Sequence, residues 1–240
     1  MWILFIFTQL LCANIWAVKA EEKIQSTKTK EEQSSLSPWQ ALEELKKGNS
    51  RFVSNRMLRR DLPAQVSTSK KQFPFAVVLN CMDSRGAPEL IFDQGIGDIF
   101  VERLAGNVAN ADVLGGMEFG TKLMGAKLIV VLGHTSCGAI KGACDNTKLG
   151  NLTELLNKIR PAVLAVQKLG KGKNCEENGI DEMAAQNVRN VISQIKKDSP
   201  VIMELIKAGK IGLVGGMHDL ATGKVSFFED SGSLPGKSKT

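Results

Sequence analysis

Residues 75–85, FAVVLNCMDSR, join an almost wholly apolar run to a cluster of chemically reactive side chains. Residues 128–137, LIVVLGHTSC, repeat that arrangement later in the chain. Short apolar runs without alternation are typical of strands that are covered on both faces of a parallel sheet. The two stretches therefore predict buried parallel strands, each followed at its carboxyl end by thiol and polar side chains.

The rest of the chain alternates strand-like and helix-like segments. We expect a helix after Ser37, because the sequence Ser-Pro-Trp-Gln supplies an N-cap, a proline at the first helical position and a capping-box glutamine. Strands alternating with helices predict an α/β fold, a single domain with a mainly parallel central β-sheet flanked by helices. Further strand patterns occupy residues 99–102, 211–214 and 224–228, and helical patterns occupy residues 112–124, 181–197 and 201–208.

Both ends of the chain are expected to lie outside the folded domain. Residues 1–20 form an apolar run with small residues placed as in a secretory cleavage site, which predicts a signal peptide. No basic residue precedes the run, so a retained membrane anchor is the alternative. Residues 21–36 are polar and charged and predict a flexible linker. Residues 37–231 would then form the catalytic domain, and residues 232–240 a flexible tail.

Composition and charge narrow the class of protein. Hydrophobic residues make up 43% of the 240 residues, enough to bury a sizeable core. Lysine and arginine total 31 against 25 acidic residues, a net charge of +6, but the charges are scattered. This pattern predicts a solvated basic surface and no nucleic-acid partner. After signal cleavage we expect a periplasmic or secreted bacterial protein without stable membrane contact.

Cysteine usage separates two kinds of thiol. In an exported protein the four cysteines beyond the signal would first suggest disulfides. Cys81 and Cys137, however, stand beside other potential metal ligands. Cys144 and Cys175 lack such neighbours, and we expect them to be ordinary small core residues, with a disulfide between them as the alternative.

The two strand ends together predict a metal site. Groups at the carboxyl ends of parallel strands converge on one edge of the sheet, so Cys81, His134 and Cys137 are expected to meet there. Two thiolates and one imidazole form a ligand set matched to zinc, and three protein ligands leave a fourth position for water or substrate, as in catalytic sites. If a helix begins at Cys137, its N-terminus would lower the pKa of that thiol. We therefore predict one catalytic Zn²⁺ per chain.

Asp83 and Arg85 follow the first cysteine and suggest a catalytic pair. A guanidinium paired with the carboxylate would hold Asp83 as an oriented anion off the metal, so Asp83 would be a ligand only in a closed form. His218 follows a separate strand, and we expect it to have a structural role.

Taken together, these motifs resemble those of the β-class carbonic anhydrases. The resemblance runs from about residue 39 to 228 and implies the family's α/β fold, with a homodimer or homotetramer whose active sites lie at subunit interfaces. The matching motifs are residues 48–52 (GNSRF), 72–74 (QFP), 81–85 (CMDSR), 88–92 (PELIF), 97–100 (GDIF), 105–107 (AGN) and 133–138 (GHTSCG).

The resemblance also implies an activity, the reversible hydration of carbon dioxide to bicarbonate and a proton. In that reaction a zinc-bound hydroxide, oriented by Asp83 and Arg85, attacks the substrate. Gln72 matches a catalytic family residue that reaches toward the substrate, often across the dimer interface. Val78 stands where members with an allosteric bicarbonate pocket carry tryptophan, so we expect an open, water-ligated metal.

Three other functions deserve comparison. A carbonyl sulfide or carbon disulfide hydrolase on the same scaffold would use the same residues and differ only in the shape of its apolar pocket. A non-catalytic periplasmic zinc-binding protein would leave the pairing of Asp83 with Arg85 unexplained. A thiol-redox protein would require a Cys-x-x-Cys pair, which the sequence does not contain.

Overall fold

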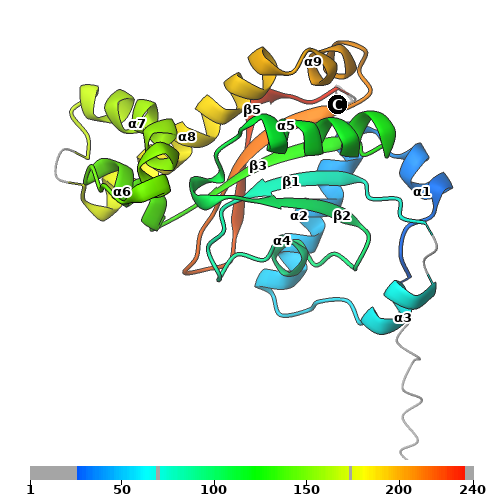
Figure 1. Ribbon diagram of the computed structural model, residues 1–240. Coiled ribbons are helices and arrows are strands. Elements are labelled where there is room, and N and C mark those ends of the chain that lie inside the picture. The colour runs from blue at the N-terminus through cyan, green and yellow to red at the C-terminus, as the bar shows by residue number, and fades with distance from the viewer. Residues whose placement is uncertain (1–25, 69–70, 173–174, 236–240) are drawn as a thin grey trace, which may run out of the picture.

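A five-stranded sheet forms the centre of the molecule in the computed structural model, which describes residues 26–68, 71–172 and 175–235 (Figure 1). The strand order is β2-β1-β3-β4-β5; the first four strands are parallel and β5 runs antiparallel to β4. The strands are β1 (Ala76–Asn80), β2 (Ile99–Arg103), β3 (Leu128–His134), β4 (Gly212–His218) and β5 (Val225–Ser233). The predicted α/β fold with a mainly parallel sheet is confirmed.

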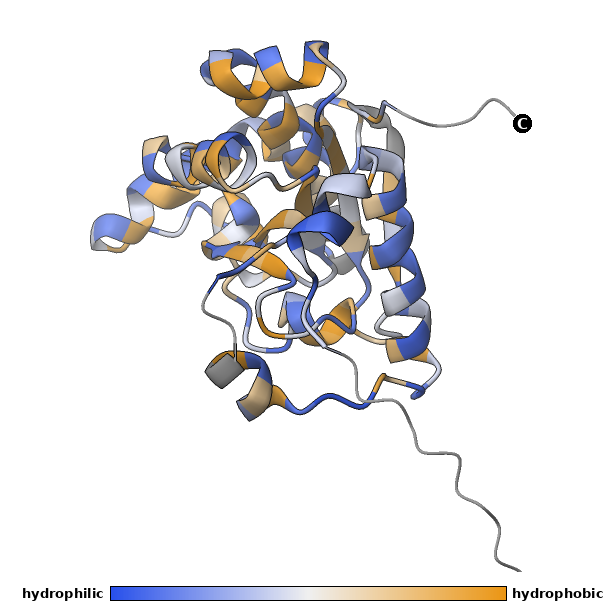
Figure 2. Ribbon diagram, turned by 90° about the vertical axis from the view of Figure 1, so that its right-hand side faces the viewer, coloured by the Kyte–Doolittle hydropathy of each residue, from blue (hydrophilic) through white to orange (hydrophobic). Residues whose placement is uncertain are grey.

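Helices cover both faces of this sheet. Every residue of β1 and β3 is buried, as their unbroken apolar runs predict. One face packs against α2 (Pro38–Val53) and α4 (Pro88–Ile91). The other face packs against α5 (Ala111–Glu118), the second half of α8 (Glu177–Asp198) and α9 (Pro200–Lys207). In Figure 2 the helices carry hydrophobic residues on one side and hydrophilic residues on the other, as expected when one side of a helix packs against the core and the other faces solvent.

A third group of helices lies beyond the carboxyl edge of the sheet. There α6 (Gly138–Cys144) and α7 (Gly150–Lys168) pack against the first half of α8 (Figure 1). This cluster encloses Cys81 and Cys137, so it forms the wall behind the predicted metal site. The remaining elements are α1 (Lys30–Ser35), α3 (Leu62–Thr68), the short 3-10 helix η1 (Ala105–Asn107) and the π-helical turn η2 (Phe119–Leu123).

The N-terminal boundary differs from the prediction. The capping box of Ser37 and Gln40 is present at the start of α2, as expected. Residues 21–36, however, are not a linker throughout, because α1 occupies Lys30–Ser35. Gln33 is only 4% exposed and donates hydrogen bonds to the carbonyls of Pro74, at 2.6 Å, and Met124, at 2.9 Å. The buried Gln33 amide, together with the Lys28 N–H that donates to Asp98 Oδ1 at 3.3 Å, therefore anchors a segment whose composition is mostly polar.

The C-terminal boundary also moves. Strand β5 continues to Ser233, two residues beyond the predicted end of the domain, so the predicted tail of residues 232–240 begins inside a strand. Gly232 fits there because a Cβ atom would lie 1.8 Å from the carbonyl oxygen of Leu213. The predicted signal at residues 1–20 and the last five tail residues lie outside the described residues. Within the described part of the chain, no helix is long and apolar enough to cross a membrane.

The two cysteines without polar neighbours form a disulfide. Cys144, at the end of α6, is bonded to Cys175, in the segment before α8, across a sequence separation of 31 residues. The prediction that both are ordinary core residues is wrong, and the alternative pairing is correct. Packing of α6 and α7 against α8 brings the two ends together, which spacing in the sequence does not indicate.

Candidate metal centre

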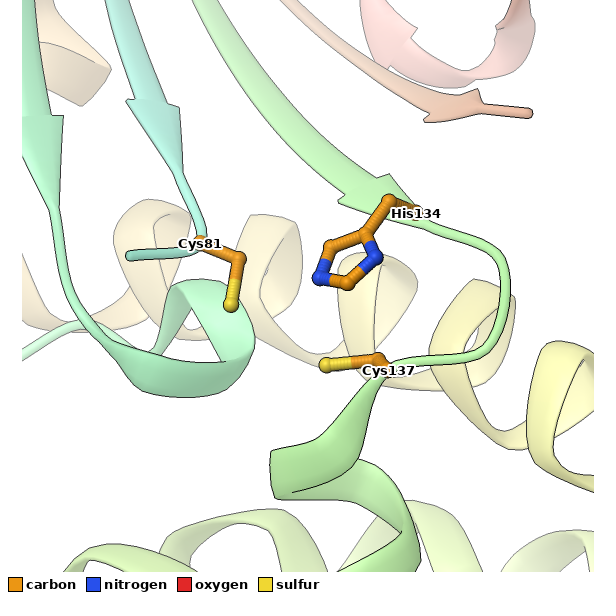
Figure 3. A group of neighbouring side chains, drawn as sticks. All are labelled: Cys81, His134 and Cys137. Carbon is orange, nitrogen blue, oxygen red and sulfur yellow. The ribbon is translucent and has the colours of Figure 1, made fainter. Parts of the chain in front are cut away.

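The three predicted ligands meet at the carboxyl edge of the sheet. Cys81 follows β1 directly, His134 is the last residue of β3, and Cys137 is the N-cap of α6. Strands β1 and β3 are paired in parallel, so their carboxyl ends lie side by side. One ligand atom from each residue lies within 4.8 Å of the other two, and all three residues are buried. Figure 3 shows the imidazole ring and the two sulfur atoms pointing toward one another.

The imidazole of His134 leaves one nitrogen for a metal. Its Nδ1 lies 2.9 Å from the carbonyl oxygen of Thr135, which fixes the ring orientation. Its Nε2 is buried and has no hydrogen-bond partner among the described residues. A buried polar atom is almost always satisfied, so an unpaired nitrogen beside two thiols fits a metal ligand. The residues present therefore match a three-ligand zinc site with one open position.

The pKa values of the two neighbouring thiols are shifted in opposite directions. A hydrogen bond from Cys137, partly opposed by burial, lowers the pKa of Cys81 to about 4. That same bond, together with burial, raises the pKa of Cys137. The net shift at Cys137 is therefore opposite to the predicted lowering, because of the neighbouring thiol and burial. The N–H groups of Ile140 and Ala139 do act in the predicted direction, but the Cys81 thiolate outweighs them.

His134 responds to the same thiolate. Burial acts to lower the pKa of His134, but its interactions with the nearby Cys81 thiolate outweigh burial and raise it. Zinc requires both thiols as thiolates and the imidazole as a neutral ligand. Loading the site must therefore release protons from these ligands.

Asp83 is held beside the ligand cluster by Arg85. The Arg85 Nε donates to Oδ1 at 2.9 Å, its Nη2 donates to Oδ2 at 2.7 Å, and its backbone N–H donates to Oδ1 at 3.0 Å. These bonds hold the pKa of the Asp83 carboxyl well below its usual range. Among the described residues, the metal-binding cluster contains the two cysteines and the histidine but not Asp83.

Arg103 contacts the backbone of the same loop, although no motif in the sequence predicts a role for it. From the end of β2 its Nη2 donates to the carbonyl of Asp83 at 2.6 Å, and its Nε donates to the carbonyl of Cys81 at 3.3 Å. The parallel register pairs Asn80 with Arg103, so β2 ends beside the Cys81 loop. The strand-end argument that located the zinc ligands, extended to this third strand, would have found Arg103.

The loop between His134 and Cys137 is braced from two sides. Ser136 has a positive φ of 52°, and its N–H donates to Asp181 Oδ1 on α8 at 2.7 Å. The N–H of Thr135 donates to the carbonyl of His218 at 3.0 Å. His218 ends β4 opposite His134 and lies outside the ligand cluster. Burial, followed by the charge of His134, lowers the pKa of His218.

Within one chain, the predicted site residue Gln72 does not lie beside the metal ligands. It is exposed and precedes β1, whereas Cys81 follows that strand. Gln72 instead lines a separate surface pocket that also contains Lys71, Phe73 and Ile96.

A cleft of about 410 Å³ opens beside the metal ligands. Its walls come from the loop after β1 and from α6 and α7, and most of its side chains are apolar. The lining residues are Cys81, Met82, Asp83, Ala105, Gly138, Ala139, Gly142, Thr147, Leu152 and Leu156.

The comparisons with known proteins agree with this geometry. A family model described as carbonic anhydrase matches residues 76–225. A carbonic anhydrase of Mycolicibacterium smegmatis is 36% identical over 206 residues, covering 83% of this chain and 96% of the relative. Carbonic anhydrase 2 of Mycobacterium tuberculosis is 34% identical over 206 residues, covering 83% and 95% of the two chains.

Solved structures resemble the fold. The β-carbonic anhydrase CcaA is 26% identical, with a TM-score of 0.62, covering 83% of this chain and 92% of that one. A tetrameric β-carbonic anhydrase of the ascomycete Sordaria macrospora is 22% identical, with a TM-score of 0.66, covering 72% and 89% of the two chains. The second likeness concerns the fold alone.

Proposed function

The chain belongs to the β-class carbonic anhydrase family, and from this membership we propose how its own residues carry out the family's reaction. That reaction is the zinc-dependent reversible hydration of carbon dioxide to bicarbonate and a proton. The zinc ligands are Cys81, His134 and Cys137, which form the buried cluster at the carboxyl edge of the sheet. This cluster, with an unpaired imidazole nitrogen facing two thiols, is the observation that carries the assignment.

Asp83 orients the nucleophile in this proposal. Zinc, when bound, supplies Lewis-acid activation that lowers the pKa of a water molecule toward neutrality. Because Arg85 keeps the Asp83 carboxylate ionised, that carboxylate accepts a hydrogen bond from the activated water and directs its lone pair. The apolar cleft walls formed by Ala139, Leu152 and Leu156 suit a small apolar substrate beside the same position.

Asp83 remains off the metal in the form that we propose. Both carboxylate oxygens are bonded to Arg85, so ligation of zinc would require this two-pronged interaction to break. Val78, fully buried in β1, stands where the family's bicarbonate-gated members carry tryptophan. Both observations support an open site in which water occupies the fourth position.

A second subunit would complete the site in a homodimer or homotetramer. Gln72 is exposed and precedes β1, whereas the ligand Cys81 follows the other end of that strand. This position is compatible with a role at the active site of a neighbouring subunit. The partner subunit's Gln72 would then contact the substrate. Sedimentation measurements should give a dimer or tetramer, and Gln72→Ala should raise the Michaelis constant without releasing zinc. A fully active monomer would contradict the proposal.

Export to the periplasm or medium is the proposed location. The apolar first twenty residues support it, and so does the disulfide between Cys144 and Cys175, because such bonds persist in oxidising compartments. Mass spectrometry of protein from the native host should find a mature chain that begins near Glu21, in the periplasmic or culture fraction. A chain that retains Met1 in the cytosolic fraction would rule out this location.

The decisive test of the activity combines metal analysis with stopped-flow hydration of carbon dioxide. We expect about one zinc per chain and hydration that requires the metal. Removing zinc with a chelator should abolish the reaction, and adding zinc back should restore it. Zinc-loaded protein that shows no hydration from neutral to alkaline pH would overturn the assignment.

A further inference from the structure

Helix α8 contributes a polar side chain to each of two loops at the metal centre. Asp181 accepts from Ser136, as described above, and Asn187 Nδ2 donates to the carbonyl of Gly106 at 2.8 Å. Asn187 is only 1% exposed and lies between Ala184 and Val188 on the apolar side of the helix. Burying an amide is unfavourable unless its hydrogen bonds are made, so this interaction is the reason that the position tolerates asparagine.

Gly106 connects Asn187 to a metal ligand. Its N–H donates to Cys81 Sγ at 3.3 Å, and this hydrogen bond is buried. The residue adopts a left-handed conformation, with φ 65° and ψ 23°, inside η1. Glycine suits this left-handed φ, and a Cβ atom here would also lie 2.5 Å from Ile159 Cδ1, so another residue would be strained in this turn. The carbonyl of Gly106 is thus held by α8, and its amide contacts the thiolate.

We propose that Asn187 is a positioning residue for the metal centre, because its hydrogen bond to the Gly106 carbonyl helps to orient the Gly106 N–H toward Cys81 Sγ. That hydrogen bond withdraws electron density from the sulfur and fixes the direction of its remaining lone pairs. Asn187 does not touch the metal and acts through its ligand. The inference rests on zinc binding at this site but not on the rate of carbon dioxide hydration.

The first test measures zinc release from the full chain into a chelating dye, with no carbon dioxide present. Asn187→Leu keeps the branched shape and the number of side-chain heavy atoms but removes the donor, and it should release zinc about tenfold faster, the lower end of the loss seen when the hydrogen bonds around a metal ligand are disturbed. Gln194→Ala is the matched control. Gln194 lies on the same helix and donates to the carbonyl of Ala109 at 3.5 Å, but it has no link to a thiolate. The control should release zinc at the wild-type rate.

The second test separates positioning from stability. In cobalt-substituted protein, the sulfur-to-cobalt charge-transfer band should move to longer wavelength in Asn187→Leu, because the thiolate becomes more electron-rich. The band should stay in place in Gln194→Ala. If Asn187→Leu does not fold, Asn187→Ser, whose side chain is too short to replace the contact, is judged by the same two measurements. A folded variant with wild-type zinc release and an unmoved band overturns the proposal, whatever its melting temperature.

Discussion

Asp93 and Asp83 are both paired with arginine, and they lie in opposite environments. Asp93 is completely buried, forms ion pairs with Arg51 and Arg60, and accepts from the N–H of Leu58. Asp83 is partly exposed and is paired with Arg85, which is mostly exposed. The first cluster joins α2, the segment before α3 and the loop after α4, whereas the second stands beside the zinc ligands. An Asp–Arg pair therefore identifies catalysis only where it adjoins a reactive position, and otherwise it can be a structural clamp.

The largest expected effect comes from breaking the buried cluster. Asp93→Asn would leave two largely buried guanidinium groups without their anion, so the free energy of unfolding should fall by about 3–5 kcal/mol. Chemical denaturation measures this change. Zinc-loaded protein that remains folded should hydrate carbon dioxide at close to the wild-type rate. A large rate loss with unchanged stability would mean that the buried cluster also serves the site.

The site pair should show the opposite pattern. Asp83→Asn removes the oriented anion but keeps the shape of the side chain, so hydration should slow by about 100-fold through loss of orientation. Zinc content and melting temperature should change little, and stopped-flow kinetics with metal analysis would measure both. Unchanged hydration would remove Asp83 from the mechanism, and loss of zinc would show that Asp83 is a ligand.

A smaller effect is expected from Arg85→Lys. Lysine keeps the positive charge but cannot make the two-pronged contact that orients the carboxylate, so hydration should slow by roughly tenfold. Asp83→Asn combined with Arg85→Lys should be no slower than Asp83→Asn alone, because the arginine acts through the carboxylate. Additive losses in the double variant would assign Arg85 a separate role.

The smallest effect concerns acid stability. Arg85 lowers the pKa of Asp83, and a carboxyl group shifted in this direction contributes stability above its ordinary pKa of about 3.9. That contribution declines as the pH falls below this ordinary value and is gone once the pH is below the lowered folded-state pKa. The difference in melting temperature between wild type and Asp83→Asn should therefore be constant at neutral pH and shrink only below about pH 4. A difference that changes between pH 8 and pH 6 would mean that another group titrates with the pair.

Local patterns predicted much of the fold and of the site. The strands at residues 75–80 and 128–132 and the capped helix after Ser37 were predictable, because burial on both faces and N-capping leave periodic or short-range signals. The boundary at α1 was not, because the contacts that hold it are long-range: the two partners of the Gln33 amide lie 41 and 91 residues away. The disulfide was left open for a similar reason, since helix packing alone decides which cysteines meet.

By itself, the sequence determined the identity of the zinc ligands, the Asp83–Arg85 pair and the family, because ligand chemistry and strand-end position are written in residue type and order. Only the tertiary structure decided that the two thiols and the imidazole lie within reach of one metal, that Arg103 and Asn187 hold the ligand loops, and that Gln72 lies away from its own chain's metal ligands. These features depend on distances between segments far apart in the chain, and hydrogen bonds and charge interactions act only where folding makes those distances short.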